Sequence, residues 1–251
     1  MNKEQPDPLY LPLSETIPET ALDKKPTWRG WIHAGVLPIV VAAGIILVVL
    51  AWGVIPKVAG AVFFACSFLL FGNSALYHRF NWKPKMRVAL KRIDHANIFL
   101  LIAGSYTPMA VLALPADKGT ALLISVWIGA LIGITFRVFW INSPRWLYVP
   151  LYVGLGWAAI FYIGDFYAFN ATAMNLILAG GLCYTLGAVV YGIKKPNLFP
   201  GHFGFHEIFH ALTVIAFICH WVAALIVIMR PLGGSLGNPI VLLSGFFFSL
   251  I

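Results

Sequence analysis

Long stretches without charged residues constrain this chain more than any other feature of its sequence. Of its 251 residues, 60% are hydrophobic and only 10% are charged, and the charges cluster between the apolar stretches. A soluble domain of average composition carries about a quarter charged residues. Stretches of close to ~20 apolar residues are long enough to cross a bilayer as helices. We therefore predict an all-α integral membrane protein with a single membrane domain.

Seven stretches reach this length, which predicts a seven-transmembrane helix bundle over residues 31–230. Their approximate bounds are His33–Val54, Gly60–His78, Asn97–Leu114, Thr120–Trp140, Trp146–Ile163, Ala173–Ile193 and His206–Met229. Residues 1–30 are polar and rich in proline, which predicts a flexible tail rather than a signal peptide. Residues 231–251 form an apolar tail whose last stretch, Asn238–Ile251, is too short to cross, so we expect an interfacial or re-entrant segment.

The basic residues predict how the bundle is oriented. Most of the 17 Lys and Arg residues fall in the amino-terminal tail and in the loops after the second, fourth and sixth stretches. The remaining ones are Lys57, Lys118 and Arg230. Cytoplasmic loops are enriched in Lys and Arg, so we predict a cytoplasmic N-terminus and a C-terminus outside. The net charge of +8 thus reflects topology, and no nucleic acid is expected as a partner. A reporter fusion that places Lys85 outside would contradict this orientation.

Histidines in the seventh stretch predict a metal site. His206 and His210 are four residues apart and share one face of a helix. Imidazoles inside a membrane segment are costly unless they are paired or bound to a metal. In the predicted topology, His78 and Asp94 arrive at the same membrane depth from the second and third stretches. Three imidazoles and a carboxylate at one depth suit Zn²⁺, and a site made of the three histidines alone would keep the fourth position open for water.

Other polar residues near these stretches have simpler interpretations. Ser74 precedes His78 by one turn and is expected to hydrogen-bond a backbone carbonyl. His220 lies ~15 Å further along its helix than His210, so we expect a hydrogen-bonded histidine within the membrane rather than a ligand of the same ion. Lone histidines at helix ends are usually interfacial, and this is the expectation for three of them: His33, His95 and His202.

The segment His206–His210 also fits the pattern H-E-x-x-H, in which a glutamate acts as the general base of a zinc protease. Intramembrane zinc proteases are usually completed by a later aspartate, and this chain has none after Asp165. We therefore do not favour a protease. Glu207 could equally face the basic loops or the lipid headgroups.

Several motifs together resemble a known family. They are Ser74-x-x-x-His78, the run Arg92–Ile98, the run Gly104–Pro108, and His206-x-x-x-His210 ahead of His220. This order resembles the hemolysin III family, the bacterial branch of the progestin and adipoQ receptor group, which includes the adiponectin receptors. The broader superfamily also holds the alkaline ceramidases. The resemblance extends from about Arg29 to Met229 and implies a multi-pass protein of a cell (plasma) membrane, the bacterial inner membrane.

The resemblance also implies roles for particular residues. Zinc would be bound by His78, His206 and His210, Asp94 would hold a water molecule on the zinc, and Ser74 would lie beside the site. Adiponectin-receptor-like sequences tend to carry Gln where this chain has Glu207, which leaves open a second acidic group near the metal. Residues that could support the site from around it are Glu207, His220, His95 and Asn97.

Three functions follow as hypotheses. The leading one is a zinc-dependent hydrolase for a lipid amide or ester from the inner leaflet, with Asp94 acting on the water and Ser74 on the developing oxyanion. The second is a non-enzymatic regulator or sensor of membrane lipid state with structural zinc. The third is a pore-forming hemolysin. Membrane lipids are the expected partners, and the oligomeric state is not predicted.

Overall fold

The computed structural model describes residues 28–229. Nearly all of the predicted amino-terminal tail and the whole predicted carboxy-terminal tail lie outside these residues. The described helices are α1 (Trp31–Leu50), α2 (Val54–Arg79), α3 (Pro84–Ala113), α4 (Ala116–Phe139), α5 (Arg145–Gly156), the 3-10 helix η1 (Ala158–Tyr162), α6 (Ile163–Phe169), α7 (Ala171–Ile193) and α8 (Phe205–Ile228).

Seven helical segments are long and apolar enough to cross a membrane, which confirms the predicted all-α bundle. The fifth is Arg145–Phe169 and comprises α5, η1 and α6. Within residues 28–229 there is no strand beyond an isolated bridge between Phe199 and Phe203. Which end of the bundle faces the cytoplasm stays a prediction from the charge distribution.

Several predicted boundaries were wrong, among them the end of the fifth span, which extends to Phe169 rather than Ile163. The connection between the first two spans is shorter than expected, because α1 ends at Leu50 and α2 already begins at Val54. Gly53 makes this turn possible with a positive φ of 88°, which a residue with a Cβ rarely adopts. α3 begins at Pro84, well before the predicted Asn97. Its first turns carry several basic residues, so hydropathy excluded them from the span although they are helical. Proline at the first helical position is common, since its missing N–H has no helical partner there.

The fifth span changes from α-helix to 3-10 helix in its middle. Such a break frees backbone groups that need partners inside a membrane. Tyr106 of α3 supplies them: its hydroxyl donates to the Gly156 carbonyl at 2.6 Å and accepts from the Ala159 amide at 2.9 Å. The indole of Trp157 donates to the Thr185 hydroxyl of α7 at 2.9 Å. α3 and α7 therefore hold the broken span in place.

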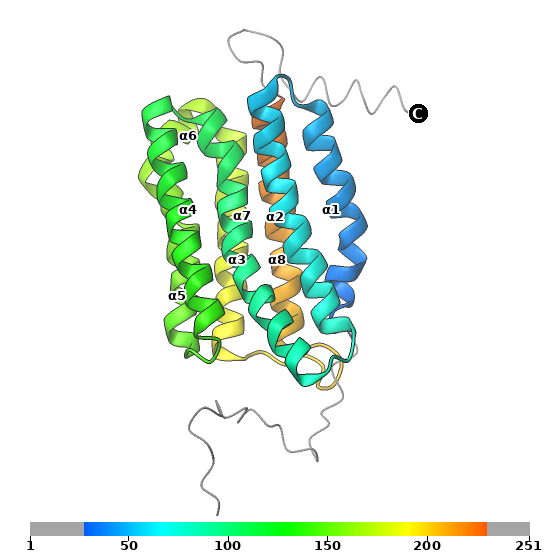
Figure 1. Cartoon of the computed structure of the whole chain (residues 1–251). Coiled ribbons are helices and arrows are strands. Elements are labelled where there is room, and N and C mark those ends of the chain that lie inside the picture. The colour runs from blue at the N-terminus through cyan, green and yellow to red at the C-terminus, as the bar shows by residue number, and fades with distance from the viewer. Residues whose placement is uncertain (1–27, 230–251) are drawn as a thin grey trace, which may run out of the picture.

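α8 lies in the middle of the bundle (Figure 1). It packs mainly on α7 and also contacts α1 and α3, while α1 packs on α2, α2 on α3 and α3 on α4. Two hydrophobic clusters meet on it. Ala223 and Val227 of α8 join the cluster around Phe99 and Val126, and Phe217 joins the cluster around Phe63 and Phe71.

The helix ends that carry the predicted site residues gather at one end of the bundle, at the bottom of Figure 1. α2 ends there, and α3 and α8 begin there. The antiparallel packing of α2 on α3 therefore brings His78, Asp94 and the first turns of α8 to the same level. This is the arrangement that the predicted topology required.

The tight approach of α3 to α4 gives a test of the packing. A Cβ added to Gly133 would lie 2.3 Å from the ring of Phe99, which is only 1% exposed. We expect Gly133→Ala to lower the free energy of unfolding by about 1–3 kcal/mol, because neither side can yield. Thermal unfolding of the purified protein in detergent would measure this. Gly154→Ala is the control, since nothing lies within 4 Å of its added Cβ. Equal melting temperatures for the two variants would contradict the packing.

Candidate metal centre

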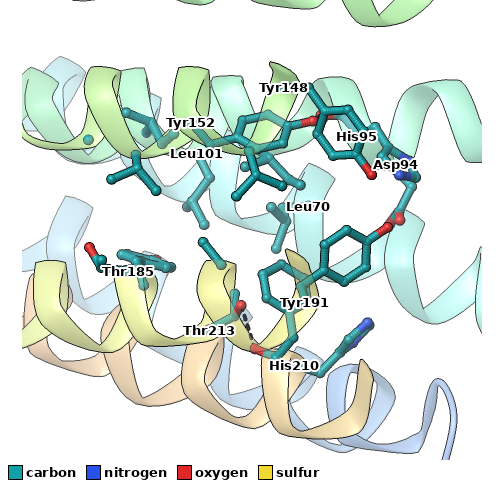
Figure 2. A pocket seen from close by; sticks show the side chains of 18 of the residues that line it. Leu70, Asp94, His95, Leu101, Tyr148, Tyr152, Thr185, Tyr191, His210 and Thr213 are labelled. Atoms are coloured by element: carbon teal, nitrogen blue, oxygen red, sulfur yellow. Dashed lines mark hydrogen bonds between the residues drawn. The ribbon is translucent and has the colours of Figure 1, made fainter. Parts of the chain in front are cut away.

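A cavity of about 770 Å³ opens at the end of the bundle where α8 begins. Asp94, His95 and His210 lie near this end, and Leu70, Leu101 and Thr213 line the wall further in (Figure 2). The lining continues to Met174 and Phe166, which belong to the opposite end of the bundle. Ligand pockets typically have volumes of about 300–1,000 Å³, so the cavity is large enough for a lipid chain.

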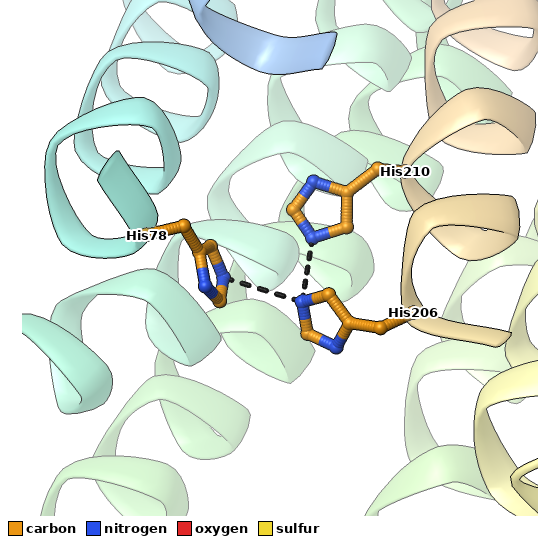
Figure 3. Close-up of side chains that lie close together, drawn as sticks. All are labelled: His78, His206 and His210. Atoms are coloured by element: carbon orange, nitrogen blue, oxygen red, sulfur yellow. Dashed lines mark hydrogen bonds between the residues drawn. The ribbon is translucent and has the colours of Figure 1, made fainter. Parts of the chain in front are cut away.

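Three histidines converge beside the mouth of this cavity (Figure 3). His78 comes from the last turn of α2, and His206 and His210 come from the first two turns of α8. The Nε2 atom of His206 lies 3.3 Å from that of His78 and 2.8 Å from that of His210. All three candidate ligand atoms lie within 4.8 Å of one another.

This spacing fits a metal ion. Tetrahedral zinc with Zn–N bonds of 2.0–2.1 Å separates two ligand nitrogens by about 3.3 Å. The distance between His78 and His206 has this value, and the distance between His206 and His210 is somewhat shorter. The three-histidine group could therefore hold a metal ion after small side-chain adjustments. The sequence predicted that His78, His206 and His210 lie together, and the structure places them together.

Asp94 and Ser74 lie next to the histidines. The Oδ2 atom of Asp94 is 3.7 Å from His78 Nε2, which is too long for a direct hydrogen bond but leaves the carboxylate at the cluster. Ser74 lies one turn before His78, is 3% exposed and lines the same cavity. Asn97 follows Asp94 by one turn, and its amide donates to the Leu69 carbonyl of α2 at 2.9 Å. It therefore helps to fix α3 against the helix that carries His78.

Glu207 points away from the histidine cluster. Its Oε1 accepts from Arg29 Nε at 2.9 Å, and its Oε2 accepts from the Gly204 amide at 2.9 Å. The side chain is 1% exposed. Adjacent helical residues are rotated by about 100°, so Glu207 cannot share the face of His206 and His210. Both carboxylate oxygens are occupied, and the H-E-x-x-H base has no support in this geometry.

The prediction that His33 and His95 are interfacial was wrong. His33 is 2% exposed, and its ring centroid lies 4.0 Å from that of His210. Neither of its ring nitrogens has a hydrogen-bond partner among the described residues. His95 is 8% exposed, and its Nδ1 lies 2.8 Å from the Lys91 carbonyl. The sequence places both near helix ends, but only the packing of α1 on α8 and of α3 on α5 buries them.

His220 lines the cavity deeper in the bundle. It stacks on Tyr184 with ring centroids 5.4 Å apart, and its Nδ1 has no hydrogen-bond partner within residues 28–229. The expected hydrogen bond at this nitrogen is therefore absent from the described part of the chain. A histidine that faces a cavity can instead meet a polar group of whatever fills it.

The ion pair between Arg29 and Glu207 generates a prediction. Hydrogen bonds to charged groups contribute about 1.5–3 kcal/mol, so Glu207→Gln should lower the free energy of unfolding by a similar amount. Bound metal should be unchanged, because Glu207 faces Arg29. Thermal unfolding and metal analysis of the same sample measure both quantities. Arg29→Gln is the matched variant, and the double variant should lose less than the sum of the two. Loss of metal from Glu207→Gln with unchanged stability would contradict the geometry.

Comparison with known proteins identifies the family. A family model described as haemolysin-III related matches residues 23–221. The chain is 33% identical over 165 residues to a Hemolysin-3 homolog of Bacillus subtilis (strain 168), covering 65% of this chain and 73% of the relative. It is 35% identical over 140 residues to Hemolysin-3 of Bacillus cereus, covering 55% and 63%.

More distant similarity extends to receptors of animals. The chain is 26% identical over 184 residues to an adiponectin receptor protein of Drosophila melanogaster, covering 66% of this chain and 41% of the relative. This agrees with the resemblance in the sequence motifs. With its seven apolar helices and a model match over most of its length, the chain belongs to the haemolysin-III-related family of membrane proteins.

Proposed function

We propose that this protein is a zinc-dependent hydrolase that cleaves an amide or ester bond of a membrane lipid. The observation that carries the proposal is the position of the three histidines and Asp94 at the mouth of a long cavity in a membrane bundle. His78, His206 and His210 would hold the metal. A zinc ion there would supply Lewis-acid polarisation of a carbonyl and make water more acidic.

Asp94 is suited to handle the proton of the attacking water. Its carboxylate lies 3.7 Å from His78 Nε2, and its side chain is 16% exposed, so water can reach it at the cavity mouth. In the proposed reaction, a carboxylate oxygen of Asp94 accepts a proton from water and later returns it to the leaving amine or alcohol. Carboxylates act as general bases and acids in this way when they are within reach of the proton.

Ser74 and the cavity wall position the substrate. The Ser74 hydroxyl belongs to the same helix face as His78, where it can donate to the carbonyl oxygen of the scissile bond. Leu70, Leu101 and Met174 line the deeper part of the cavity. Burial of an acyl chain against such side chains stabilises the complex by roughly 25 cal/mol per Å² of apolar surface. The substrate would then reach the site with its polar end towards the histidines.

Metal content gives the first test. Carefully purified protein should contain about one zinc ion per chain, and His206→Ala/His210→Ala should contain almost none, since two of three ligands are lost. His220→Ala is the control on the same helix, because it lies ~15 Å from His210 and should keep its zinc. Elemental analysis measures all three proteins. Wild type without bound metal would remove the basis of the proposal.

Activity gives the second test. Asp94→Asn should lower the rate of fatty-acid release by about 10²–10⁴-fold, because the general base is lost. The variant should keep its zinc and its melting temperature. The measurement is product release from a panel of lipid amides and esters by zinc-loaded protein in detergent. Zinc-loaded wild type that is inert on the whole panel would contradict the proposal of a hydrolase. Full activity of Asp94→Asn would contradict the role of Asp94 as general base.

A structural role for the metal is the second candidate. Phe71 of α2 packs on Phe217 of α8 inside the bundle, and a metal held by His78, His206 and His210 would add a second link between these two helices at their end. A non-enzymatic regulator of membrane lipid state with structural zinc predicts that His78→Ala lowers the melting temperature. It also predicts that Asp94→Ala changes no activity. The lipid panel therefore separates it from the hydrolase.

The Bacillus cereus relative is named Hemolysin-3, and the third candidate is therefore a hemolysin, which we take to act by forming a pore. A pore would release dye from liposomes that contain the purified protein, whereas a hydrolase with a lipid-filled cavity would not. Retention of the dye at protein densities that saturate the liposomes would exclude this function.

A further inference from the structure

Arg137 is a buried cation without a carboxylate partner. It occupies the last turn of α4 and is 1% exposed. Its Nη1 donates to the Ser143 hydroxyl, and its guanidinium lies 4.0 Å from the centroid of the Tyr148 ring. Among residues 28–229, its Nε has no hydrogen-bond partner and no carboxylate pairs with it. A buried charge of this kind is costly unless a counter-ion completes it.

Arg137 also lines the cavity, and further cations surround the same end of it. They are Arg29, Arg87, Lys91, Arg145 and Lys194, whereas Asp94 is the single carboxylate among the described lining residues. Arg29 is already paired with Glu207. Arg145 donates one hydrogen bond to the Tyr191 carbonyl at 3.2 Å. This bond leaves its other N–H groups available, and it does not neutralise the positive charge. The mouth of the cavity therefore carries an excess of positive charge.

This positive region lies close to the candidate metal centre. The Tyr148 ring that Arg137 covers is 6.2 Å, centroid to centroid, from the ring of His95. His95 is the neighbour of Asp94, and Asp94 lies 3.7 Å from His78. One aromatic ring thus separates Arg137 from the residues around the histidine cluster. Arg137 and the three histidines line the same cavity.

We propose that Arg137, with Arg145 and Ser143, binds the oxyanion of an acidic lipid whose chain fills the cavity. A phosphate or carboxylate would receive hydrogen bonds from the guanidinium groups, which match planar oxyanions better than ammonium groups do. The lipid supplies the counter-ion that Arg137 lacks. This inference rests on the proposed function in one respect, since it makes the substrate of the hydrolase an acidic lipid.

The burial of Arg137 also determines which lipids the cavity selects. A neutral lipid of equal chain length fills the apolar part of the cavity but leaves Arg137 without a counter-ion. Sites with buried polar groups reject ligands that leave those groups unpaired much more strongly than apolar pockets reject a change of size. The anion site therefore favours acidic over neutral lipids for two reasons. An acidic lipid forms hydrogen bonds with the guanidinium groups, and a neutral lipid leaves the buried charge of Arg137 unpaired.

The test measures lipid binding to the purified full chain in uncharged detergent, by ligand-induced rise in melting temperature and by titration. The probes are short-chain phosphatidic acid, diacylglycerol with the same chains, decanoate and inorganic phosphate. We expect phosphatidic acid to bind more tightly than diacylglycerol by about ten-fold or more, as hydrogen bonds to charged groups imply. Decanoate should also bind. Inorganic phosphate alone should bind weakly, which would assign the oxyanion to a lipid rather than to a free ion.

Variants decide whether Arg137 is responsible. Arg137→Gln should abolish the preference for phosphatidic acid over diacylglycerol, and Arg137→Lys should reduce it. Arg79→Gln is the matched control, because Arg79 is exposed at the same end of the bundle, lies over Trp31 and does not line the cavity. Wild-type preference in Arg137→Gln would overturn the inference, as would tight binding of inorganic phosphate alone. If Arg137→Gln does not fold, Arg137→Lys and Arg145→Gln decide, and unchanged preference in both overturns it.

The metal-free variant separates this inference from the hydrolase. His206→Ala/His210→Ala should still prefer phosphatidic acid, because neither histidine contacts Arg137. Absence of hydrolysis with an Arg137-dependent preference would reject the hydrolase and keep the anion site. Hydrolysis of neutral and acidic lipids at equal rates, with no effect of Arg137→Gln, would keep the hydrolase and reject the anion site.

Discussion

The packing of α8 against both hydrophobic clusters is the constraint on which the other features depend. Ile215 and Ile218 of α8 face outwards, whereas its polar residues Glu207, His210 and Thr213 are buried and need partners inside the bundle. Thr213 satisfies its hydroxyl within the helix by donating to the Phe209 carbonyl, and Trp221 donates to the Ala43 carbonyl of α1. Within residues 28–229, the rings of His206 and His210 have no such backbone partner, and they meet each other and His78. The convergence of three imidazoles at this end of the bundle, which could hold a metal ion, fits this need for partners.

The fold was largely predictable because the length and hydropathy of each span can be read directly along the sequence. The seven spans, their alternation and the shared depth of His78, Asp94 and His206 all follow from counting residues between charged loops. The helix starts at Val54 and Pro84 were less predictable, since apolar content locates the membrane core rather than the ends of the helix. Gly53 precedes the first of these helix starts and Pro84 is the second, and both residue types are common at helix boundaries.

The surroundings of the candidate site were less predictable, because they depend on which helices are neighbours and how each is rotated. Arg29 and Glu207 are 178 residues apart in the chain, and nothing in either segment indicates their contact. The same holds for His33 against His210, and for Arg137 beneath Tyr148. The spacing of His206 and His210 was sufficient for their own pairing, since it is local to one helix. The burial of Arg137 had no comparable local signal.

The salt bridge between Arg29 and Glu207 has a mechanical consequence. Arg29 lies two residues before α1, and Glu207 caps the first turn of α8 through the Gly204 amide. The chain segment that enters α1 is therefore fastened to the turn that carries His206. A displacement of the segment that enters α1 would therefore act on the turn that carries His206 through this ion pair. The start of α1 and the first turn of α8 hold each other in place.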